Sequence, residues 1–402
     1  MKEELTRCLN CIKKPCMNNC PLNNDIPSII KLLKEDKIDE SYELLTSTTC
    51  IPSICGRICN HPCMLNCTKS KIDKPVNIGN IETYLGDLYL DKEYITKKDN
   101  NKKIAIIGSG PSSLTCSYFL RKEGYQVTIY EKNSKLGGLL EYGIPSFRLD
   151  RNILKQNIDK IINIGIKVEL NKELGKDIKL DELIKEYDAI YLGIGANVSN
   201  KLNIEGEELN NVYGANELLE TQKHPDYKNK IVCIIGGGNV ACDIARTIKR
   251  LDAKEVNIIY RRSKIEMPAS PYEIEEVLKE KINIIYQTNI LKIKEKEIEL
   301  IKTELINDDN NRKKPINIEG TEYNYKCDYL IKALGSQPSN IINELGLELD
   351  EKGYIKVDNY QTSNKKVFAG GDIIGKQKTV SSAARDGRES ANAIIKYLKE
   401  GI

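Results

Sequence analysis

The sequence has 402 residues, of which 40% are hydrophobic and 30% charged, with 61 Lys and Arg side chains against 58 Asp and Glu. This near balance of charge excludes the strongly basic surface of a typical nucleic-acid-binding protein, and the lack of a long apolar run excludes a transmembrane helix. The first residues, MKEELTRCLNC, contain no apolar signal segment, so we expect a soluble cytoplasmic protein of two or three domains.

The first 67 residues hold nine of the thirteen cysteines. These nine are Cys8, Cys11, Cys16, Cys20, Cys50, Cys55, Cys59, Cys63 and Cys67. The others are scattered, at Cys116, Cys233, Cys242 and Cys327. A local group of thiols in a chain without a secretory signal indicates metal binding. A disulfide-stapled head and a zinc site are the alternatives.

Residues 1–95 form this cysteine-rich head, which also contains amphipathic stretches at 26–33 and 38–45 that predict helices. The polar and charged segment 91–103 predicts a linker. After it, short apolar runs alternate with helical patterns. That alternation is typical of βαβ units around a parallel sheet.

An apolar strand at 103–107 runs directly into a loop with Gly108, Gly110 and Ser113, and a helix follows. Gly108 permits the tight turn, and Gly110 lets the backbone approach a pyrophosphate at the helix N-terminus. Ser113 is the small residue that packs the helix against the strand. The next strand ends at Glu131, whose carboxylate accepts hydrogen bonds from ribose hydroxyls and disfavours a 2′-phosphate. The loop predicts an FAD or NAD site; a glycine-rich structural turn is the alternative.

A second strand–loop–helix unit begins at residue 231. Its loop consists of Gly236, Gly237, Gly238, Asn239, Val240 and Ala241. The strand that follows, 255–260, ends at Arg261 and Arg262, with no acid beside them. Guanidinium groups bind a 2′-phosphate through paired, charge-assisted hydrogen bonds, so this loop predicts NADP(H). An ordinary solvated basic pair is the alternative.

Two dinucleotide loops in one chain predict hydride exchange between two bound cofactors, NADPH and a flavin. That step needs no acid or base from the protein, so we assign no catalytic residue. The composition agrees, because the two histidines, His61 and His224, belong to no Ser/His/Asp set.

Eight segments carry the motifs of one enzyme family. They are Arg7–Cys11, Cys20–Leu22, Cys55–Cys59, Val76–Glu82, Gly137–Leu149, Gly237–Arg246, Tyr260–Pro268 and Val367–Asp372. Together they resemble the small (beta) subunit of NADPH-dependent glutamate synthase, across essentially the whole chain. The resemblance extends to the N-terminal half of dihydropyrimidine dehydrogenase and to the large subunit of NADH-dependent ferredoxin:NADP oxidoreductase.

This resemblance implies an α/β fold with two Rossmann-like dinucleotide-binding domains, as in disulfide-reductase-like flavoproteins, preceded by an α-helical domain with two [4Fe–4S] clusters. The implied domains are a helical iron–sulfur domain at 1–95, an FAD domain made of 102–198 and 328–402, and an NADPH domain inserted at 199–327.

The resemblance also implies the cofactor-binding residues. For FAD they are Gly108, Gly110, Pro111, Ser112, Ser113, Glu131, Lys132, Gly138, Arg148, Leu174, Gly371, Asp372, Thr379 and Val380. For NADPH they are Gly236, Gly237, Gly238, Asn239, Val240, Ala241, Arg261, Arg262, Ala333 and Gly335. A surface salt bridge is the alternative for Arg148.

Eight ligands for the two clusters follow from the same resemblance. The first cluster takes Cys8, Cys11, Cys16 and Cys67, and the second takes Cys20, Cys59, Cys63 and the carboxylate of Glu82. The run that ends in Cys20-Pro is ferredoxin-like, and in such runs the last cysteine binds the other cluster. The spacer from Cys59 to Cys63 is shorter than in the relatives, so other ligands stay open for the second cluster. These are Cys50, Cys55 and His61. For Cys50 and Cys55 the simpler interpretation is a small buried hydrophobe.

The implied function is that of an NADPH-dependent flavoprotein oxidoreductase, of the type that serves glutamate biosynthesis. It would pass electrons between NADPH, FAD, the clusters and a partner. The chain has no room for a second catalytic barrel, so we expect a larger catalytic or electron-accepting subunit as partner, and neither nucleic acid nor membrane. Two alternatives stay open: a subunit of an electron-bifurcating NADH/ferredoxin:NADP oxidoreductase, and a non-enzymatic scaffold with degenerate nucleotide folds.

Overall fold

A computed structural model describes residues 1–307 and 313–400. The chain forms two compact units, one of Met1–Ala196 with Pro338–Ile402 and the other of Asn197–Gln337. The second unit ends ten residues beyond the domain end expected at residue 327, because the strand at Tyr329–Lys332 belongs to its sheet.

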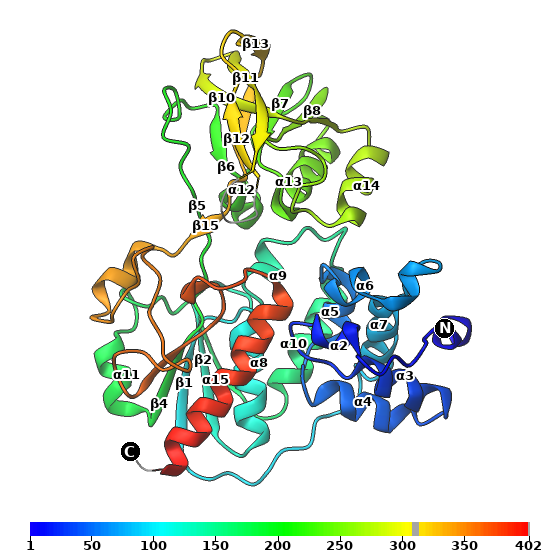
Figure 1. The fold of residues 1–402 in the computed structure, drawn as a ribbon. Helices are drawn as coiled ribbons and strands as arrows, with labels where there is room; N and C mark the ends of the chain where they lie inside the picture. The colour runs from blue at the N-terminus through cyan, green and yellow to red at the C-terminus, as the bar shows by residue number, and fades with distance from the viewer. Residues whose placement is uncertain (308–312, 401–402) are drawn as a thin grey trace. The chain divides into compact units, whose positions relative to one another are not determined.

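The first unit begins with the cysteine-rich head, which is helical (Figure 1). Its helices are α1 (Lys2–Thr6), α2 (Pro15–Asn18), α3 (Ile26–Lys34), α4 (Ile38–Thr46), α5 (Pro52–Ile58), α6 (Pro62–Leu65) and α7 (Ile78–Leu88), with a 3-10 turn at Thr68–Lys71. The two amphipathic stretches are thus helices α3 and α4. Asp25 caps α3 by accepting a hydrogen bond from the Ser28 backbone N–H, which satisfies one of the free donors of the first turn.

A five-stranded parallel sheet follows, in the order β16-β4-β1-β2-β3. Its strands are β1 (Lys103–Ile107), β2 (Gln126–Glu131), β3 (Lys167–Leu170), β4 (Ala189–Leu192) and β16 (Val367–Ala369). The helices are α8 (Pro111–Lys122), α9 (Leu139–Tyr142), α10 (Arg151–Ile162), α11 (Leu180–Glu186) and α15 (Val380–Glu400), with 3-10 turns at Asn340–Glu344 and Gly371–Ile374. Strand β16 joins the sheet at its edge after the chain has returned from the second unit.

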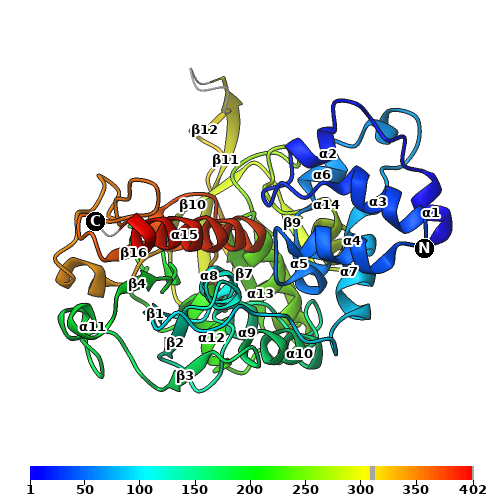
Figure 2. The ribbon, with the colours of Figure 1, turned by 90° about the horizontal axis from the view of Figure 1, so that it is seen from below.

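Helix α15 lies along α8, and this packing unites the two separated pieces of the first unit (Figure 2). The two helices approach closely at Gly387, where an added Cβ would lie 2.0 Å from the Ser112 carbonyl oxygen. A side chain at this position would therefore push the helices apart. The Arg388 guanidinium, one residue further along α15, donates 3.0 Å hydrogen bonds to the Leu22 and Thr48 carbonyls of the head.

The second unit has its own parallel sheet, in the order β6-β14-β7-β8-β9. Its strands are β6 (Val212–Gly214), β7 (Ile231–Ile235), β8 (Glu255–Ile259), β9 (Asn283–Ile285) and β14 (Tyr329–Lys332), and its helices are α12 (Ala215–Thr221), α13 (Asn239–Arg250) and α14 (Pro271–Lys279). An antiparallel sheet lies between β9 and β14 in sequence and consists of β10 (Thr288–Ile293), β11 (Glu297–Ile306), β12 (Lys314–Asn317) and β13 (Tyr323–Lys326). The short strands β5 (Val198–Ser199) and β15 (Ser336–Gln337) pair at the two ends of the unit.

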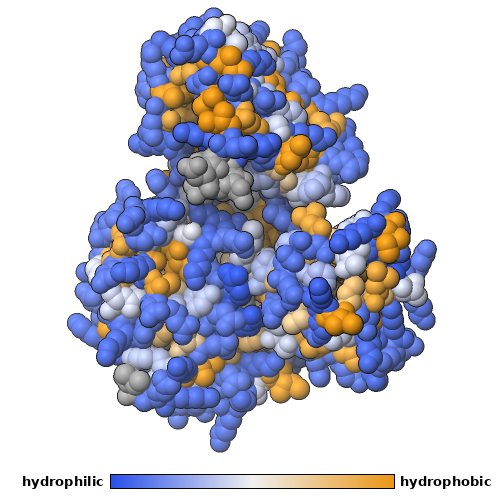
Figure 3. Space-filling model, in the orientation of Figure 1, coloured by the Kyte–Doolittle hydropathy of each residue, from blue (hydrophilic) through white to orange (hydrophobic). Residues whose placement is uncertain are grey.

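Within the described residues, none of the helices combines the length and the apolar character needed to cross a membrane. The face drawn in Figure 3 is mostly hydrophilic, with hydrophobic side chains scattered over it.

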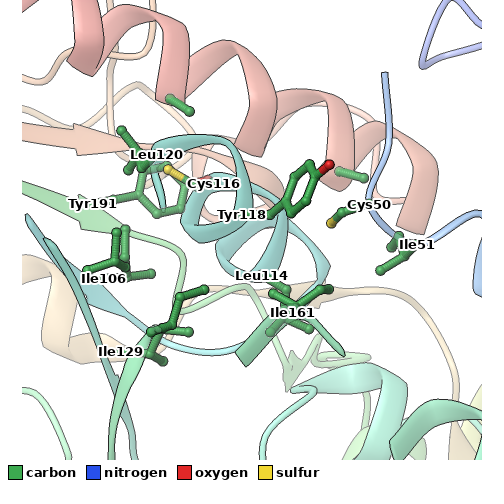
Figure 4. Packing of buried hydrophobic residues seen from close by; sticks show 14 of the residues in the cluster. Cys50, Ile51, Ile106, Leu114, Cys116, Tyr118, Leu120, Ile129, Ile161 and Tyr191 are labelled. Atoms are coloured by element: carbon green, nitrogen blue, oxygen red, sulfur yellow. The ribbon is translucent and has the colours of Figure 1, made fainter. Parts of the chain in front are cut away.

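The largest buried core of the first unit runs from the sheet into the head. In Figure 4, Ile106 and Ile129 of the strands face α8, and Cys50 and Ile51 of the head lie beyond Tyr118. The segment expected to be a linker also packs here, since Tyr94 contacts this core. The head and the first sheet therefore share one hydrophobic core, and they are fixed to each other by it.

Candidate functional site

The first glycine loop lies between β1 and α8 and leaves space at one position only. Gly108 has φ +92°, and a Cβ there would lie 2.6 Å from the Gly193 carbonyl oxygen, so the fold itself requires glycine. Gly110 has an ordinary φ of −67°, and a Cβ added to it would meet no atom within 4 Å. The open space beside Gly110, at the start of α8, is suited to a pyrophosphate. Ser113 is buried, with its Oγ 3.4 Å from the Gly193 carbonyl oxygen, which explains why this position must be small.

Glu131 is buried at the end of β2 and is held by two hydrogen bonds. Its carboxylate accepts one from the Ser109 hydroxyl at 2.6 Å and one from the Asn133 backbone N–H at 2.9 Å. Ser109 Oγ also accepts from the Gly137 N–H at 3.0 Å, and a Cβ on Gly138 would lie 2.9 Å from Gly110 Cα. The structure thus brings Glu131 and the loop at 137–138 to the first glycine loop. Sequence reasoning missed Ser109, although it stands between the two glycines of the motif.

The residues of the C-terminal piece reach the same loop. A Cβ on Gly371, which has φ +76°, would lie 3.0 Å from the Ser112 Cβ, so the turn at Gly371–Ile374 lies against the start of α8. Burial raises the pKa of Asp372 in this turn to about 6. Thr379 precedes α15, and its hydroxyl accepts a hydrogen bond from the Ser382 N–H at 3.2 Å.

Three other residues expected near FAD have different surroundings. Leu174 is buried in a hydrophobic cluster with Ile107 and Ala369, so its side chain has a packing role in the structure. Lys132 is exposed, and Arg148 is half-buried.

The glycine loop of the second unit repeats the geometry of the first. A Cβ on Gly236, which has φ +144°, would lie 2.2 Å from the Ala333 carbonyl oxygen, and one on Gly237 would lie 2.5 Å from the Tyr260 ring. Gly238 has φ −89° and stands at the start of α13, and a Cβ on it would meet nothing within 4 Å. The space again lies at the helix N-terminus. Ala333 is next to this loop, and Asn239 Oδ1 accepts a hydrogen bond from the Ser270 N–H at 2.9 Å, which fixes the start of α14.

Arg261 and Arg262 follow β8 after Tyr260, and strand β11 and the turn before β10 position them. The Thr303 hydroxyl of β11 donates to the Arg261 carbonyl at 2.8 Å, and the Gln287 N–H donates to the Arg262 carbonyl at 3.0 Å. Arg262 Nε donates to the Lys313 carbonyl at 3.0 Å. Sequence reasoning found the arginine pair but missed Thr303 and Gln287, because Thr303 lies in another sheet and Gln287 in the turn that leads into β10.

Replacing Thr303 by valine is expected to raise the KM for NADPH about fivefold and to leave the KM for NADH unchanged, since one neutral hydrogen bond contributes about 1 kcal/mol. The substitution keeps the shape of the side chain and removes only the bond to Arg261. Steady-state kinetics with both nucleotides check this. An equal rise for NADH would show that Thr303 supports the whole domain rather than the arginine pair.

The cysteines of the head form two groups, which we call the outer and the inner thiol group. In the outer group, burial and the negative charges of Cys8 and Cys67 raise the pKa of Cys16 to about 11. In the inner group, burial raises the pKa of Cys59 to about 11, and the charges of Glu82 and Cys20 add to it. Cys63 belongs to the inner group as well, since burial and the charges of Glu82, Cys20 and Cys59 raise its pKa. Nothing in the described contacts links Cys11 to either group.

Helices α2 and α6 are two copies of one turn. Each follows a residue with left-handed backbone, Lys14 (φ 41°, ψ 54°) or His61 (φ 47°, ψ 55°), and each starts with Pro-Cys-Met. The turns close alike: the Asn19 and Asn66 amides donate to the Pro15 and Pro62 carbonyls. Cys16 of α2 and Cys67 after α6 belong to the outer group. Cys20 after α2 and Cys63 of α6 belong to the inner group. The sequence repeat Pro-Cys-Met-x-Asn-Cys contains the signal for this arrangement, which sequence reasoning overlooked.

Glu82 is buried in α7, and its Oε1 accepts a 2.8 Å hydrogen bond from Asn24 Nδ2. Burial raises the pKa of this carboxyl to about 7. Cys55 faces the same group, because the charges of Glu82, Cys59 and Cys20 add to the effect of burial in raising its pKa. The inner group therefore has five candidate ligands. Cys50 does not belong to it, since its Sγ lies 3.6 Å from the Thr115 hydroxyl of α8.

Thiols that raise one another's pKa, as in both groups, suit a positively charged group that compensates the charge of the thiolates, which is the chemistry of an iron–sulfur cluster. No three His, Cys, Asp or Glu side chains converge on a single metal-ion position anywhere in 1–307 or 313–400. His61 is half-buried; its ring lies against Gly79, and its backbone N–H donates to the Cys59 Sγ at 3.3 Å.

The inner group adjoins residues that the sequence predicts to bind FAD. Cys59 Sγ lies 3.6 Å from the hydroxyl of Ser381, the second residue of α15, and Thr379 and Val380 precede that residue directly. The outer group has no such contact with the sheet domain among the described hydrogen bonds.

Two family models match this chain. Residues 102–387 match the pyridine nucleotide-disulphide oxidoreductase family, and residues 1–94 match domain II of dihydropyrimidine dehydrogenase, which has a 4Fe-4S cluster. The second match covers the head, in which both thiol groups lie.

Curated relatives match over nearly the whole chain. The chain is 33% identical to the glutamate synthase [NADPH] small chain of Escherichia coli (strain K12), over 99% of this chain and 91% of that protein. It is 32% identical to the NADP(+)-dependent formate dehydrogenase subunit beta of Moorella thermoacetica, over 97% of this chain but 60% of that protein. The chain thus spans less than two thirds of the latter relative.

Among solved structures, FprA from Mycobacterium tuberculosis in complex with NADPH superposes with a TM-score of 0.67, over 75% of this chain and 86% of that chain. The identity is 20%, so this likeness concerns the fold alone.

Proposed function

We propose that this NADPH-dependent oxidoreductase, which belongs to the pyridine nucleotide-disulphide oxidoreductase family, supplies electrons to a larger subunit. The glutamate synthase small chains among its relatives confirm the family expected from the motifs. The observation that carries the proposal is the pair of matching glycine loops. Each loop is followed by a helix and then by a strand, and these two strands end differently. One ends at Glu131, and the other continues into Arg261 and Arg262.

FAD fits the first loop. The space beside Gly110 admits the pyrophosphate at the α8 N-terminus, and Glu131 and Ser109 are placed to bind the ribose. Gly371 of the C-terminal piece lies against Ser112 at the start of α8, and Asp372 follows it in the same turn. Thr379 and Val380 lie at the start of α15. When bound, FAD accepts a hydride from NADPH and passes its two electrons on singly.

NADPH fits the second loop. The space beside Gly238 takes the pyrophosphate, and the Arg261–Arg262 pair binds the 2′-phosphate, with its backbone held by Thr303 and Gln287. An acid in the same place would repel that phosphate. The remaining residues of the site are Gly236, Gly237, Asn239, Val240, Ala241, Ala333 and Gly335.

The two thiol groups hold two [4Fe–4S] clusters. The outer group supplies Cys8, Cys16 and Cys67, with Cys11 from the loop before α2, and the inner group supplies Cys20, Cys59, Cys63 and Glu82. Cys55 is an alternative ligand for the inner group, because burial and the charges of Glu82, Cys59 and Cys20 raise its pKa as well. Ser381, at the start of α15, contacts Cys59 of the inner group. The inner group would therefore hold the cluster nearer to α15, and each cluster would supply one-electron transfer.

The acceptor of these electrons is a larger catalytic or electron-accepting subunit. The relatives carry names as different as glutamate synthase and formate dehydrogenase, so relatives of this kind are used in more than one enzyme. A glutamate synthase large subunit is our first candidate because the small chains of that enzyme match this chain almost end to end.

An anaerobic titration of the purified protein with NADPH tests the proposal. The flavin absorbance should bleach, and the broad iron–sulfur absorbance should fall with it, after addition of one to two equivalents. NADH should act only at much higher concentration. A protein that contains flavin but is not reduced by NADPH would contradict the proposed function.

Replacing Arg261 and Arg262 together by alanine is expected to raise the KM for NADPH by about tenfold to a hundredfold, because charge-assisted hydrogen bonds contribute about 1.5–3 kcal/mol each. The KM for NADH should stay within about twofold. Lys254→Ala is the matched control, since Lys254 is an exposed cation at the opposite end of β8. If the double variant binds NADPH normally, the arginine pair does not bind the 2′-phosphate.

A further inference from the structure

Four large hydrophobic side chains are exposed on the two segments that carry the outer thiol group. Their exposed fractions are 48% for Leu9, 99% for Ile12, 63% for Leu65 and 71% for Ile72. Side chains of this kind are usually exposed singly, and a local set of them marks an interaction surface. We call these four residues the outer patch.

The outer patch comes from two stretches of sequence that meet in space. Leu9 and Ile12 each follow a cysteine of the first stretch, and Leu65 lies in α6, which packs against α2. Arg7 joins the stretches by donating to the Lys74 carbonyl and the Asp73 carboxylate, next to Ile72. The patch therefore lies around Cys8, Cys16 and Cys67, all of which are partly exposed.

Positive charge surrounds these hydrophobic side chains. The stretches 7–16 and 65–75 contain six Lys and Arg side chains and a single carboxylate, that of Asp73. Arg7 is paired with Asp73 and Glu4, and Lys14 is paired with Asp25, which leaves four lysines as the source of the positive charge. Lys13, Lys71 and Lys74 are exposed, and no ion pair involves them among the described residues. The whole chain has a net charge of only +3, so this face is much more basic than the average surface.

We propose that the outer patch is the docking surface for an electron-accepting protein whose own surface has an apolar centre and an acidic rim. The proposal rests on the proposed function and adds to it the face and the charge of the partner. Each NADPH becomes NADP⁺ and H⁺ and yields two electrons, so two one-electron transfers to the partner follow each hydride. Opposite charge on the partner steers it to the patch, and its apolar centre covers the four hydrophobic side chains.

A second copy of this chain fits the patch poorly. A two-fold contact places the same residues of both copies against each other, which would bring lysines to lysines. An anionic membrane surface would also attract lysines and exposed hydrophobic side chains, and the test below includes it.

The test measures how fast the NADPH-reduced protein reduces two protein acceptors, an acidic [2Fe–2S] ferredoxin and the basic cytochrome c. The variant Lys13→Glu/Lys71→Glu is compared with Lys185→Glu/Lys352→Glu, which changes the net charge equally at exposed lysines of the same unit. Reversing the patch charges should lower the rate constant with ferredoxin about tenfold or more at low salt and weaken its salt dependence. The same variant should react faster with cytochrome c. Ile12→Ser should lower the ferredoxin rate also at high salt, where steering is screened.

Reduction of a small neutral quinone separates this proposal from the proposed function, since a quinone needs no docking surface. If the wild-type protein fails to reduce the quinone with NADPH, the proposed function is wrong. If quinone reduction is normal in every variant and the two double variants reduce ferredoxin equally fast, the docking surface is wrong. Binding to vesicles of anionic lipid, or self-association in ultracentrifugation, that is lost in Lys13→Glu/Lys71→Glu would also overturn it.

Discussion

Replacing Cys67 by serine is expected to remove one cluster and to stop delivery of electrons to protein acceptors. Cys67 follows α6, is partly exposed and belongs to the outer thiol group, so its loss leaves the core of the head intact. Iron and acid-labile sulfide should fall from about eight to about four atoms per chain, since each [4Fe–4S] cluster contains four of each. Reduction of a protein acceptor should fall at least a hundredfold, while NADPH-dependent quinone reduction should stay within about twofold.

Cys50→Ser is the matched control for this experiment. Cys50 is a thiol of the same head, but it lies against Thr115 and outside both groups, so its replacement should leave the iron content unchanged. Cys55→Ser distinguishes the ligand sets of the inner group: a loss of iron there would make Cys55 a ligand in place of one we assign. Retention of all iron in Cys67→Ser would contradict the outer ligand set.

Replacing Gly110 by alanine is expected to weaken FAD binding by about a hundredfold without unfolding the protein. The backbone at Gly110 is ordinary (φ −67°), and an added Cβ meets no protein atom within 4 Å. The free energy of unfolding of the apoprotein should therefore fall by no more than about 1 kcal/mol, as expected for an exchange at a helix N-cap. The new methyl group would instead occupy the space that the pyrophosphate needs. Flavin content, FAD titration and the apoprotein melting temperature measure the two effects separately.

Two glycines serve as comparisons. Gly238→Ala makes the same change in the second loop, and it should weaken NADPH binding while FAD stays bound. Gly108→Ala combines φ +92° with a contact of 2.6 Å to the Gly193 carbonyl oxygen, so it should destabilise the apoprotein itself. Normal flavin content in Gly110→Ala would mean that no pyrophosphate lies beside this residue.

Local patterns predicted much of the fold. Short stretches of sequence encode the strand–glycine–helix units at 103 and 231. They also encode the acid at the end of the strand after the first unit and the arginines that follow the strand after the second. Turn geometry and strand register are local properties, so short stretches suffice. The family matches confirm the expected α/β flavoprotein fold with a 4Fe-4S domain at its N-terminus. Helices α3 and α4 begin where the amphipathic stretches begin.

Such local patterns do not predict contacts between segments that are distant in the sequence. Sequence spacing did not reveal that Cys55 faces Glu82, that Ser381 of the last helix contacts Cys59, or that Thr303 fixes Arg261. Each of these contacts joins separate elements, so only the packing of the whole unit determines it. The antiparallel sheet between β9 and β14 was also not expected, and its strand β11 helps to position the arginine pair.

The course of the chain through the first unit also bears on its biosynthesis. Strand β16 and helix α15 come after the entire second unit in sequence, yet α15 packs along α8, and Arg388 holds carbonyls of the head. On the ribosome, the head and the first four strands emerge early and must wait for these late residues. The second unit, by contrast, is contiguous and folds as soon as it has emerged. Ser381 belongs to the same late segment, so its contact with Cys59 of the head cannot form until synthesis is nearly finished.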